Sequence, residues 1–258
     1  MKKASERIVL ITGGSAGLGL ALAAEMLKDG SKVIVCSRSN ERLEKAKKAF
    51  PALTTIQCDI TSASDRDALL GRITAEVPDL NMLINNAGIV ERFHVLHDPD
   101  FTQAVESEWK TNYFAALEMI RLFLPLLKKN AGTIVNVGSG LAYIPLHIQP
   151  NYSATKAALH SFTLSLRWQL AGSGIDVKEI LYPAVRTEFQ KGRNPAFAID
   201  AKPAARMALN GLNSGADEVR VGMVKKLYLL ARLLPETALK LLNRRIEQTV
   251  RTVDFKRT

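Results

Sequence analysis

The stretch RIVLITGGSAGLG, residues 7–19, joins an apolar run to a glycine-rich turn. The run is rich in β-branched side chains and predicts a strand. Gly13, Gly17 and Gly19 follow it, and a helical pattern begins within the turn. Glycines at such a place let a phosphate approach the free N–H groups of a helix N-terminus. The stretch therefore predicts the start of a nucleotide-binding α/β fold, with a plain tight turn as the alternative, because its G-x-x-x-G-x-G spacing departs from the G-x-G-x-x-G fingerprint.

The rest of the chain continues this alternation of apolar strands and helices. Strands are predicted at 7–12, 32–37, 54–58, 81–85, 133–137, 176–181 and 218–221, and helices at 18–28, 41–49, 64–76, 101–129 and 152–171. The order predicts a Rossmann-type, doubly wound parallel sheet of about seven strands with helices on both faces. No linker or internal repeat divides the 258 residues, so we expect a single domain over 1–258. Ligands of such folds bind at the carboxyl ends of the strands.

Composition places the chain among ordinary globular proteins, with 47% hydrophobic and 23% charged residues. Cys36 and Cys58 form no disulfide framework, and the four histidines show no metal-binding spacing, so no metal site is expected. The apolar stretch after Lys2 and Lys3 is interrupted by charged and turn residues, which argues against a signal peptide. Since no long apolar run follows, we expect a cytoplasmic protein.

Most of the formal charge of +10 lies near the C-terminus. From Gly222 onward, nine Lys or Arg residues face three acidic ones, and leucines are interspersed among them. We expect residues 222–258 to form a basic amphipathic extension, a helix pair broken at Pro235. It could dock on the domain, cover the substrate, or make peripheral contact with an anionic membrane surface. Nucleic-acid binding is not expected, because no recognition motif or aromatic-interleaved basic patch is present.

The second predicted strand ends in Ser37 and Arg38, with no acidic residue before Glu41. In dinucleotide-binding folds an acid at this place binds the ribose hydroxyls of NAD, whereas Arg accommodates the 2′-phosphate of NADP. The guanidinium suits a phosphate because its N–H donors form a planar fork. We therefore predict NADP (NADPH) as the cofactor in preference to NAD. An exposed loop arginine is the alternative.

The next three strand ends also carry polar groups. Asp59, after the third strand, could accept a hydrogen bond from an adenine amine or could cap a helix. Asn86, Ala87 and Gly88, after the fourth strand, offer an amide and a small-residue bend that could line a flat cofactor. The fifth strand runs into VGSG and exposes Ser139 at its carboxyl end.

Tyr152 and Lys156 stand four residues apart in NYSATKAALH, so a helix places them on one face. A phenol has a pKa near 10. An ammonium held beside it favours the phenolate and lowers that pKa. Taken alone, the pair is better explained as a buried tyrosine beside a solvated lysine, so the rest of the chain must decide.

Together these motifs resemble the short-chain dehydrogenase/reductase family, in its single-domain branch of about 250 residues. TGGSAGLG matches the branch's T-G-x-x-x-G-x-G, and NNAG is present unchanged. Ser139 falls on the family's serine, Tyr152 and Lys156 fall on its Y-x-x-x-K, and Asn112 falls on its helix asparagine. The resemblance covers residues 7–187.

The resemblance implies a catalytic tetrad. Tyr152 would exchange a proton with the substrate oxygen, and Lys156 would lower the pKa of that tyrosine and hold the nicotinamide ribose. Ser139 would donate a hydrogen bond to the substrate carbonyl, and Asn112 would complete a water relay behind Lys156. The resemblance also implies a homodimer or homotetramer formed through the long helices.

The strand ends and the resemblance together give a set of expected cofactor-binding positions: Gly13, Ser15, Gly17, Leu18, Gly19, Ser37, Arg38, Asp59, Ile60, Asn86, Ala87, Gly88, Tyr152, Lys156, Pro183, Val185 and Thr187. One departure lies among them. The family usually has Pro-Gly after the sixth strand, and this chain has Pro183 followed by Ala184. Because Ala disfavours positive φ, the loop near the nicotinamide could bend differently. Thr187 still occupies the position of the family's carboxamide-contacting threonine.

Substrate contact is expected at Ser139, Leu141, His147, Tyr152 and Phe189, within and before a substrate-loop region at 188–215. Most of the neighbouring side chains are apolar, so a hydrophobic secondary alcohol and the corresponding ketone, or an aldehyde, are the expected substrates. His147 could also be a loop histidine with no chemical role. Two other functions stay open: a catalytically idle NADP-binding regulatory protein, and a membrane-surface protein that uses the basic tail.

Overall fold

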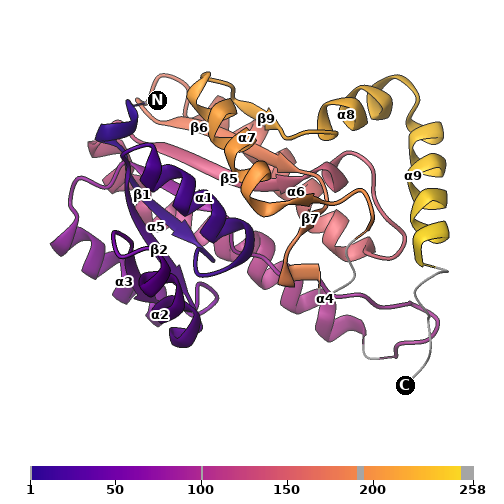
Figure 1. Cartoon of the computed structure of the whole chain (residues 1–258), viewed down its shortest axis with the longest axis horizontal. Coiled ribbons are helices and arrows are strands. Elements are labelled where there is room, and N and C mark those ends of the chain that lie inside the picture. The colour runs from indigo at the N-terminus through magenta and orange to yellow at the C-terminus, as the bar shows by residue number, and fades with distance from the viewer. Residues whose placement is uncertain (1, 100, 191–194, 251–258) are drawn as a thin grey trace.

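The computed structural model describes residues 2–99, 101–190 and 195–250. A seven-stranded sheet runs through its centre in the order β3-β2-β1-β4-β5-β6-β9, and every neighbouring pair is parallel (Figure 1). The strands are β1 (Ile8–Thr12), β2 (Lys32–Ser37), β3 (Thr54–Gln57), β4 (Met82–Asn85), β5 (Thr133–Ser139), β6 (Asp176–Tyr182) and β9 (Glu218–Arg220). All seven strands were predicted from the sequence, to within two residues at each end.

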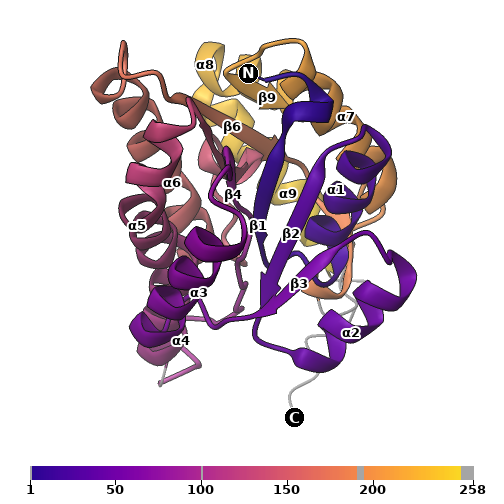
Figure 2. The same ribbon diagram turned by 90° about the vertical axis from the view of Figure 1, so that its left-hand side faces the viewer.

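Helices cover both faces of the sheet (Figure 2). Three pack on one face: α1 (Gly17–Lys28), α2 (Asn40–Ala49) and α7 (Ala201–Asn213). Three pack on the other: α3 (Ala63–Glu76), α5 (Ala115–Lys129) and α6 (Pro150–Gln169). The alternation of side chains along a strand explains this, since Val9 and Ile11 join the first core and Leu10 joins the second. The predicted doubly wound fold is confirmed.

The order of the strands reverses beside β1, because the chain leaves it toward β2 and β3 and later returns to β4 on its other side. The loops that follow β1 and β4 therefore diverge and leave a crevice at the carboxyl edge of the sheet. The polar strand ends identified in the sequence meet at this edge.

The predicted helix over 101–129 is divided in the structure. α4 (Phe101–Trp109) passes into one π-helical segment, Lys110–Phe114, before α5 begins. Such π segments are rare and occur often at functional sites. This one contains Asn112, which is buried.

The predicted substrate-loop region, 188–215, contains two different structures. Residues 191–194 lie outside the described residues. Two short strands, β7 (Val185–Arg186) and β8 (Ile199–Asp200), pair in parallel and bring the two ends of the intervening segment together. An ion pair of 2.9 Å between Arg186 and Asp200 reinforces this junction. The C-terminal part of the region is helix α7, which packs on α1, so a substrate loop stays a prediction for the part before β8 alone.

The C-terminal extension is a helix pair, as predicted, with α8 (Val224–Leu233) and α9 (Pro235–Val250) meeting at Pro235. α9 packs on Ile144 and Leu146 in a third, smaller core. Residues 251–258 of the predicted extension lie outside the described residues. No helix in the described ranges combines the length and the apolar character that crossing a bilayer requires.

Candidate active site

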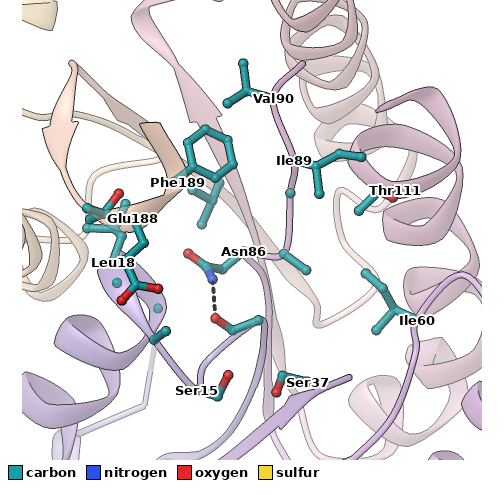
Figure 3. Close-up of a pocket in the computed structure, with 18 of the residues that line it drawn as sticks. Ser15, Leu18, Ser37, Ile60, Asn86, Ile89, Val90, Thr111, Glu188 and Phe189 are labelled. Atoms are coloured by element: carbon teal, nitrogen blue, oxygen red, sulfur yellow. Dashed lines mark hydrogen bonds between the residues drawn. The ribbon is translucent and has the colours of Figure 1, made fainter. Parts of the chain in front are cut away.

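A cavity of about 750 Å³ opens at the carboxyl edge of the sheet (Figure 3). Every cofactor-binding position expected from the sequence, from Gly13 to Thr187, lines it. Ser15 and Ser37 lie toward one end of the view, and Val90 and Phe189 lie toward the other. The lining of the cavity thus includes both the β2 loop and the expected tetrad residues Tyr152 and Lys156 on α6.

The glycine turn forms one wall of the cavity and requires glycine for two reasons. Gly13 has φ of 65°, and a Cβ there would lie 2.9 Å from the Cα of Ala87. A Cβ on Gly19 would lie 2.5 Å from the Asn86 side-chain nitrogen. The turn is held against the β4 loop, since Asn86 Nδ2 donates to the Gly13 carbonyl at 3.2 Å and Thr12 Oγ1 accepts from the backbone N–H groups of Asn86 and Ala87, each at 3.0 Å.

The β2 end of the cavity fits a phosphate-bearing group. Ser37 Oγ is buried and has no hydrogen-bond partner within the described structure. Arg38 and Arg42 line the same end, and Arg42 forms an exposed ion pair of 3.0 Å with Glu188. Arg42 was not predicted from the sequence, although its position in the first turn of α2, four residues after Arg38, was a usable signal. An unpaired hydroxyl and two guanidinium groups together provide donors for an anion.

Asp59 lines the cavity beside Ile60. Its Oδ1 accepts hydrogen bonds from the Thr61 N–H at 2.9 Å and the Thr61 hydroxyl at 2.8 Å. The side chain thus stabilises the turn before α3, as in the capping alternative, while its position on the wall keeps it available for the predicted adenine contact.

Three members of the expected tetrad, Ser139, Tyr152 and Lys156, line the cavity together. Lys156 Nζ donates to the Val137 carbonyl at 2.8 Å and lies 5.7 Å from the centre of the Tyr152 ring. Asn112 lies behind this wall. Its Oδ1 accepts from the Ile89 N–H at 2.8 Å and its Nδ2 donates to the Ile89 carbonyl at 2.9 Å, so in this structure it holds the β4 loop.

The electrostatics of the tyrosine differ from the sequence-based expectation. Burial raises the pKa of Tyr152 above its usual value, and a hydrogen bond with Ser139 only partly opposes this. Burial also lowers the pKa of Lys156 to about 8, although the negative charges of Glu179 and Glu108 counteract it. The predicted lowering of the tyrosine pKa by the lysine is therefore not seen, because desolvation is the larger effect.

A Glu–His pair that was not predicted from the sequence lies beside the lysine, with a buried carboxylate and a partly exposed imidazole. Glu179 on β6 is fully buried, and its Oε2 lies 2.6 Å from Nδ1 of His160. Its Oε1 has no hydrogen-bond partner within the described structure. His160 follows Lys156 by one helical turn on α6, so both side chains share a face. The glycine at 138 makes room for the carboxylate, because a Cβ there would lie 2.5 Å from Oε1.

A second buried carboxylate, Glu108, approaches from α4. It accepts hydrogen bonds from the Glu91 N–H and from Nδ2 of Asn151, while Asn151 Oδ1 accepts from Trp109 Nε1. Burial raises the pKa of Glu108. This cluster joins α4 to the first turn of α6 and so fixes the helix that carries Tyr152.

The end of the cavity away from β2 combines apolar side chains with the polar Thr111. Ile89, Val90 and Phe189 line it, and the Phe189 ring meets the Tyr152 ring edge-on at 5.8 Å. Two of the predicted substrate residues are not brought here and need correction. Leu141 packs in the small core under α8 and α9. His147 is held by Asn243 of α9, which accepts from its backbone N–H at 2.8 Å.

The loop after β6 carries the other departure noted in the sequence. Ala184 is not among the residues with positive φ, and its carbonyl accepts a hydrogen bond from the Ile199 N–H at 3.1 Å. The chain thus passes this point in a conformation that alanine adopts without strain. Pro183, Val185 and Thr187 still line the cavity.

A doubly wound sheet with a phosphate-accepting end and a Ser–Tyr–Lys group in one cavity defines a dinucleotide-dependent oxidoreductase class. Residues 7–197 match the short chain dehydrogenase family. The chain belongs to the short-chain dehydrogenase/reductase family.

Individual relatives agree with this membership. An uncharacterized oxidoreductase, DltE, of Bacillus subtilis is 41% identical over 229 residues, which cover 84% of this chain and 88% of the relative. An NADP-dependent 3-hydroxy acid dehydrogenase, YdfG, of Salmonella typhi is 32% identical over 67% of this chain and 70% of its own. A short chain dehydrogenase from Burkholderia cenocepacia, solved in complex with NADP, superposes with a TM-score of 0.82 at 31% identity, covering 93% of this chain and 99% of that chain.

Proposed function

We propose that this protein is an NADP(H)-dependent oxidoreductase that interconverts a hydrophobic secondary alcohol and its ketone, or an aldehyde. The observation that carries the proposal is the convergence of Ser139, Tyr152 and Lys156 on one cavity whose opposite end holds Arg38 and Arg42. The free, buried Cys36 and Cys58 are consistent with a reducing, cytoplasmic setting, which we include in the proposal.

Each polar group at the substrate end has a distinct task. The nicotinamide group supplies or accepts the hydride when it is bound. In the direction of reduction, the Tyr152 hydroxyl donates its proton to the substrate oxygen, and Ser139 donates a hydrogen bond to the same oxygen as negative charge develops there. A protonated Lys156 stabilises the phenolate that remains on Tyr152. In oxidation the same phenolate accepts the proton of the alcohol.

The preference for NADP(H) rests on the β2 end of the cavity. Ser37 offers an unpaired hydroxyl, and Arg38 and Arg42 offer guanidinium groups where a 2′-phosphate would lie. The YdfG relative and the Burkholderia cenocepacia structure are named for NADP, which favours the same choice. Parallel titrations with NADPH and NADH test it, and equal or tighter binding of NADH would contradict it.

The preference for an apolar substrate rests on Ile89, Val90 and Phe189 in the cavity lining, of which Phe189 contacts the Tyr152 ring. A panel of ketones, aldehydes, alcohols and 3-hydroxy acids, followed at the nicotinamide absorbance, tests this part. Faster turnover of small charged substrates than of apolar carbonyls would contradict the substrate class and leave the oxidoreductase assignment in place.

A catalytically idle NADP-binding regulator is the alternative. Tyr152→Phe discriminates between the two, because it removes the proton donor and leaves the ring in the wall. We expect turnover to fall at least about a hundredfold while NADPH binding is retained. Tyr228→Phe on α8, outside the cavity lining, is the matched control. Absence of turnover in the unaltered protein across the whole panel would favour the regulator.

A further inference from the structure

The helices α8 and α9 form an elbow at the outer edge of the molecule, which we call the basic elbow and define as residues 224–247 (Figure 1). Its inner side belongs to the protein core. Ala238, Leu242 and Ile246 of α9 are buried against Ile144 and Leu146 of the loop before α6. The elbow is therefore a fixed part of the fold whose geometry does not depend on a partner.

The outer side of the basic elbow exposes leucines that the fold leaves uncovered. Leu229 is 57% exposed and Leu233, one turn further along α8, is 75% exposed. Leu234 at the corner is 54% exposed, and Leu241 on α9 is 58% exposed. Exposed leucines occur singly on most surfaces, but several on one short helix pair mark an interaction surface.

Basic residues flank these leucines along the sequence. Exposed Lys225 and Lys226 precede Leu229 by one turn, and Arg232 stands next to Leu233. Lys240 and Arg244 continue the basic character along α9. Glu236 and Glu247 are the acidic residues of the elbow, and Glu236 is within 3.8 Å of Lys240. The surface thus combines apolar side chains with a clear excess of positive charge.

This combination fits an anionic lipid surface. In an interfacial helix, leucines enter the boundary of the acyl chains while Lys and Arg contact the headgroups. We propose that the basic elbow docks on anionic bilayers, with Leu229, Leu233 and Leu234 inserted at the interface and the flanking bases on lipid phosphates. The attachment is peripheral, since none of the described helices could cross the bilayer. This proposal is independent of the proposed enzymatic function.

A second copy of the chain is a poorer occupant of the same surface. A two-fold contact places the same patch on both subunits, so Lys225, Lys226 and Arg232 would face their own equivalents. Like charges brought together in this way oppose association. An anionic bilayer instead neutralises the bases and covers the leucines at the same time.

Co-sedimentation of the full chain with vesicles tests the proposal. Phosphatidylcholine vesicles with and without phosphatidylglycerol are compared at low and high salt. We expect binding that requires phosphatidylglycerol and weakens with salt. Leu229→Ser/Leu233→Ser is expected to lower the partition coefficient at least about tenfold, because it removes two inserted side chains.

Charge reversal at Lys225→Glu/Lys226→Glu is expected to have an effect of similar size, at least about tenfold. Two variants serve as matched controls. Lys128→Glu/Lys129→Glu makes the same change at an exposed lysine pair on α5, and Leu96→Ser removes a leucine that is 83% exposed in the loop before α4. Both should bind vesicles like the unaltered protein.

Three results would overturn the proposal: no co-sedimentation with anionic vesicles, equal losses in the elbow and control variants, or a self-association that only the elbow variants abolish. Circular dichroism and thermal unfolding of each variant exclude a folding defect. The assay measures lipid binding directly, so its outcome does not depend on whether an enzymatic substrate is found.

Discussion

Replacing Glu179 by Gln is expected to lower the pH at which Lys156 loses its proton. The substitution keeps the size of a fully buried side chain and removes its negative charge. The charges that act on Lys156 are Glu179 from β6 and Glu108 from α4, and both raise its pKa against the effect of burial. His160 is the direct hydrogen-bond partner of Glu179, and the Gln side chain retains an oxygen at that place.

The magnitude follows from the balance around the lysine. The pKa of Lys156 is about 8 with both carboxylates present. A neighbouring opposite charge in a buried site shifts a pKa by roughly one to three units. Because Glu108 remains in the variant, we expect a fall of roughly one unit, which corresponds to about 1.4 kcal/mol. Near pH 8 the protonated fraction of Lys156 would then fall from about one half to about one tenth.

The assay is the dependence of kcat/KM on pH, measured with the best substrate of the panel and saturating NADPH. In Glu179→Gln the fall of kcat/KM at high pH should begin at a lower pH. The pH dependence of NADPH affinity should shift in the same direction, and this second measurement needs no turnover. Glu218→Gln, a carboxylate on β9 that pairs with Arg220, is the matched control and should leave the profile unchanged. In a Lys156→Arg background, Glu179→Gln should have no effect on the profile, because a guanidinium does not titrate in this range.

An unchanged basic limb in Glu179→Gln would refute the reasoning, since it would make the buried carboxylate purely structural. An equal shift in Glu218→Gln would also refute it, because the effect would then come from general charge. A loss of folding would appear in the thermal unfolding of the variant and is separable from a change in the profile.

Further predictions concern stability, cofactor binding and assembly. The folded pKa of Lys156, about 8, lies below its unfolded value of 10.5. The free energy of unfolding should therefore rise with pH across this interval, by up to about 3 kcal/mol relative to Lys156→Met. Urea titrations at a series of pH values measure it, and the same pH dependence in both proteins would contradict it. Above pH of about 10 the free energy of unfolding should fall again, because burial raises the pKa of Tyr152 and Tyr182 and only the unfolded chain loses these protons there. Gly13→Ala should weaken NADPH binding at least about tenfold, because Gly13 has φ of 65° and Ala87 leaves no room for a Cβ. Gly71→Ala, in open space on α3, is the control and should leave NADPH binding unchanged. Fluorescence titration measures both. Arg38→Ala should weaken NADPH binding about tenfold and leave NADH binding nearly unchanged, and equal effects on both would count against a 2′-phosphate contact. We propose a homodimer or homotetramer in which Trp168, 84% exposed on α6, lies in the interface between subunits. Trp168→Arg should then shift the sedimentation coefficient toward that of a monomer. A monomeric unaltered protein would contradict the proposal.

The sequence predicted the sheet well because its signals are local. The strands alternate between two buried faces, so residues such as Leu10 and Ile34 stand in apolar runs that are visible without a structure. The cofactor wall was predictable for a related reason. Parallel strands end at one edge, and polar or glycine residues after a strand therefore meet there.

Other features were hidden because they depend on contacts between distant segments. Glu179 lies in a strand that also carries Asp176 and Lys178, so its charge does not set it apart in the sequence, and only the packing of α6 places His160 beside it. The π segment around Asn112 has no sequence signature, so one continuous helix was predicted. His147 was assigned to the substrate because it precedes the catalytic helix, yet Asn243, 96 residues later, binds it.

The ladder between β7 and β8 has a consequence for how this chain can be redesigned. Val185 pairs with Ile199, and Arg186 pairs with Asp200, so the two ends of the segment that follows the cofactor wall are joined to each other. Loop-closure entropy changes only slowly with length once the ends are fixed in this way. Phe189 lies just after this fixed end and contacts the Tyr152 ring, so substitutions at Phe189 offer a way to alter substrate preference without rebuilding the sheet.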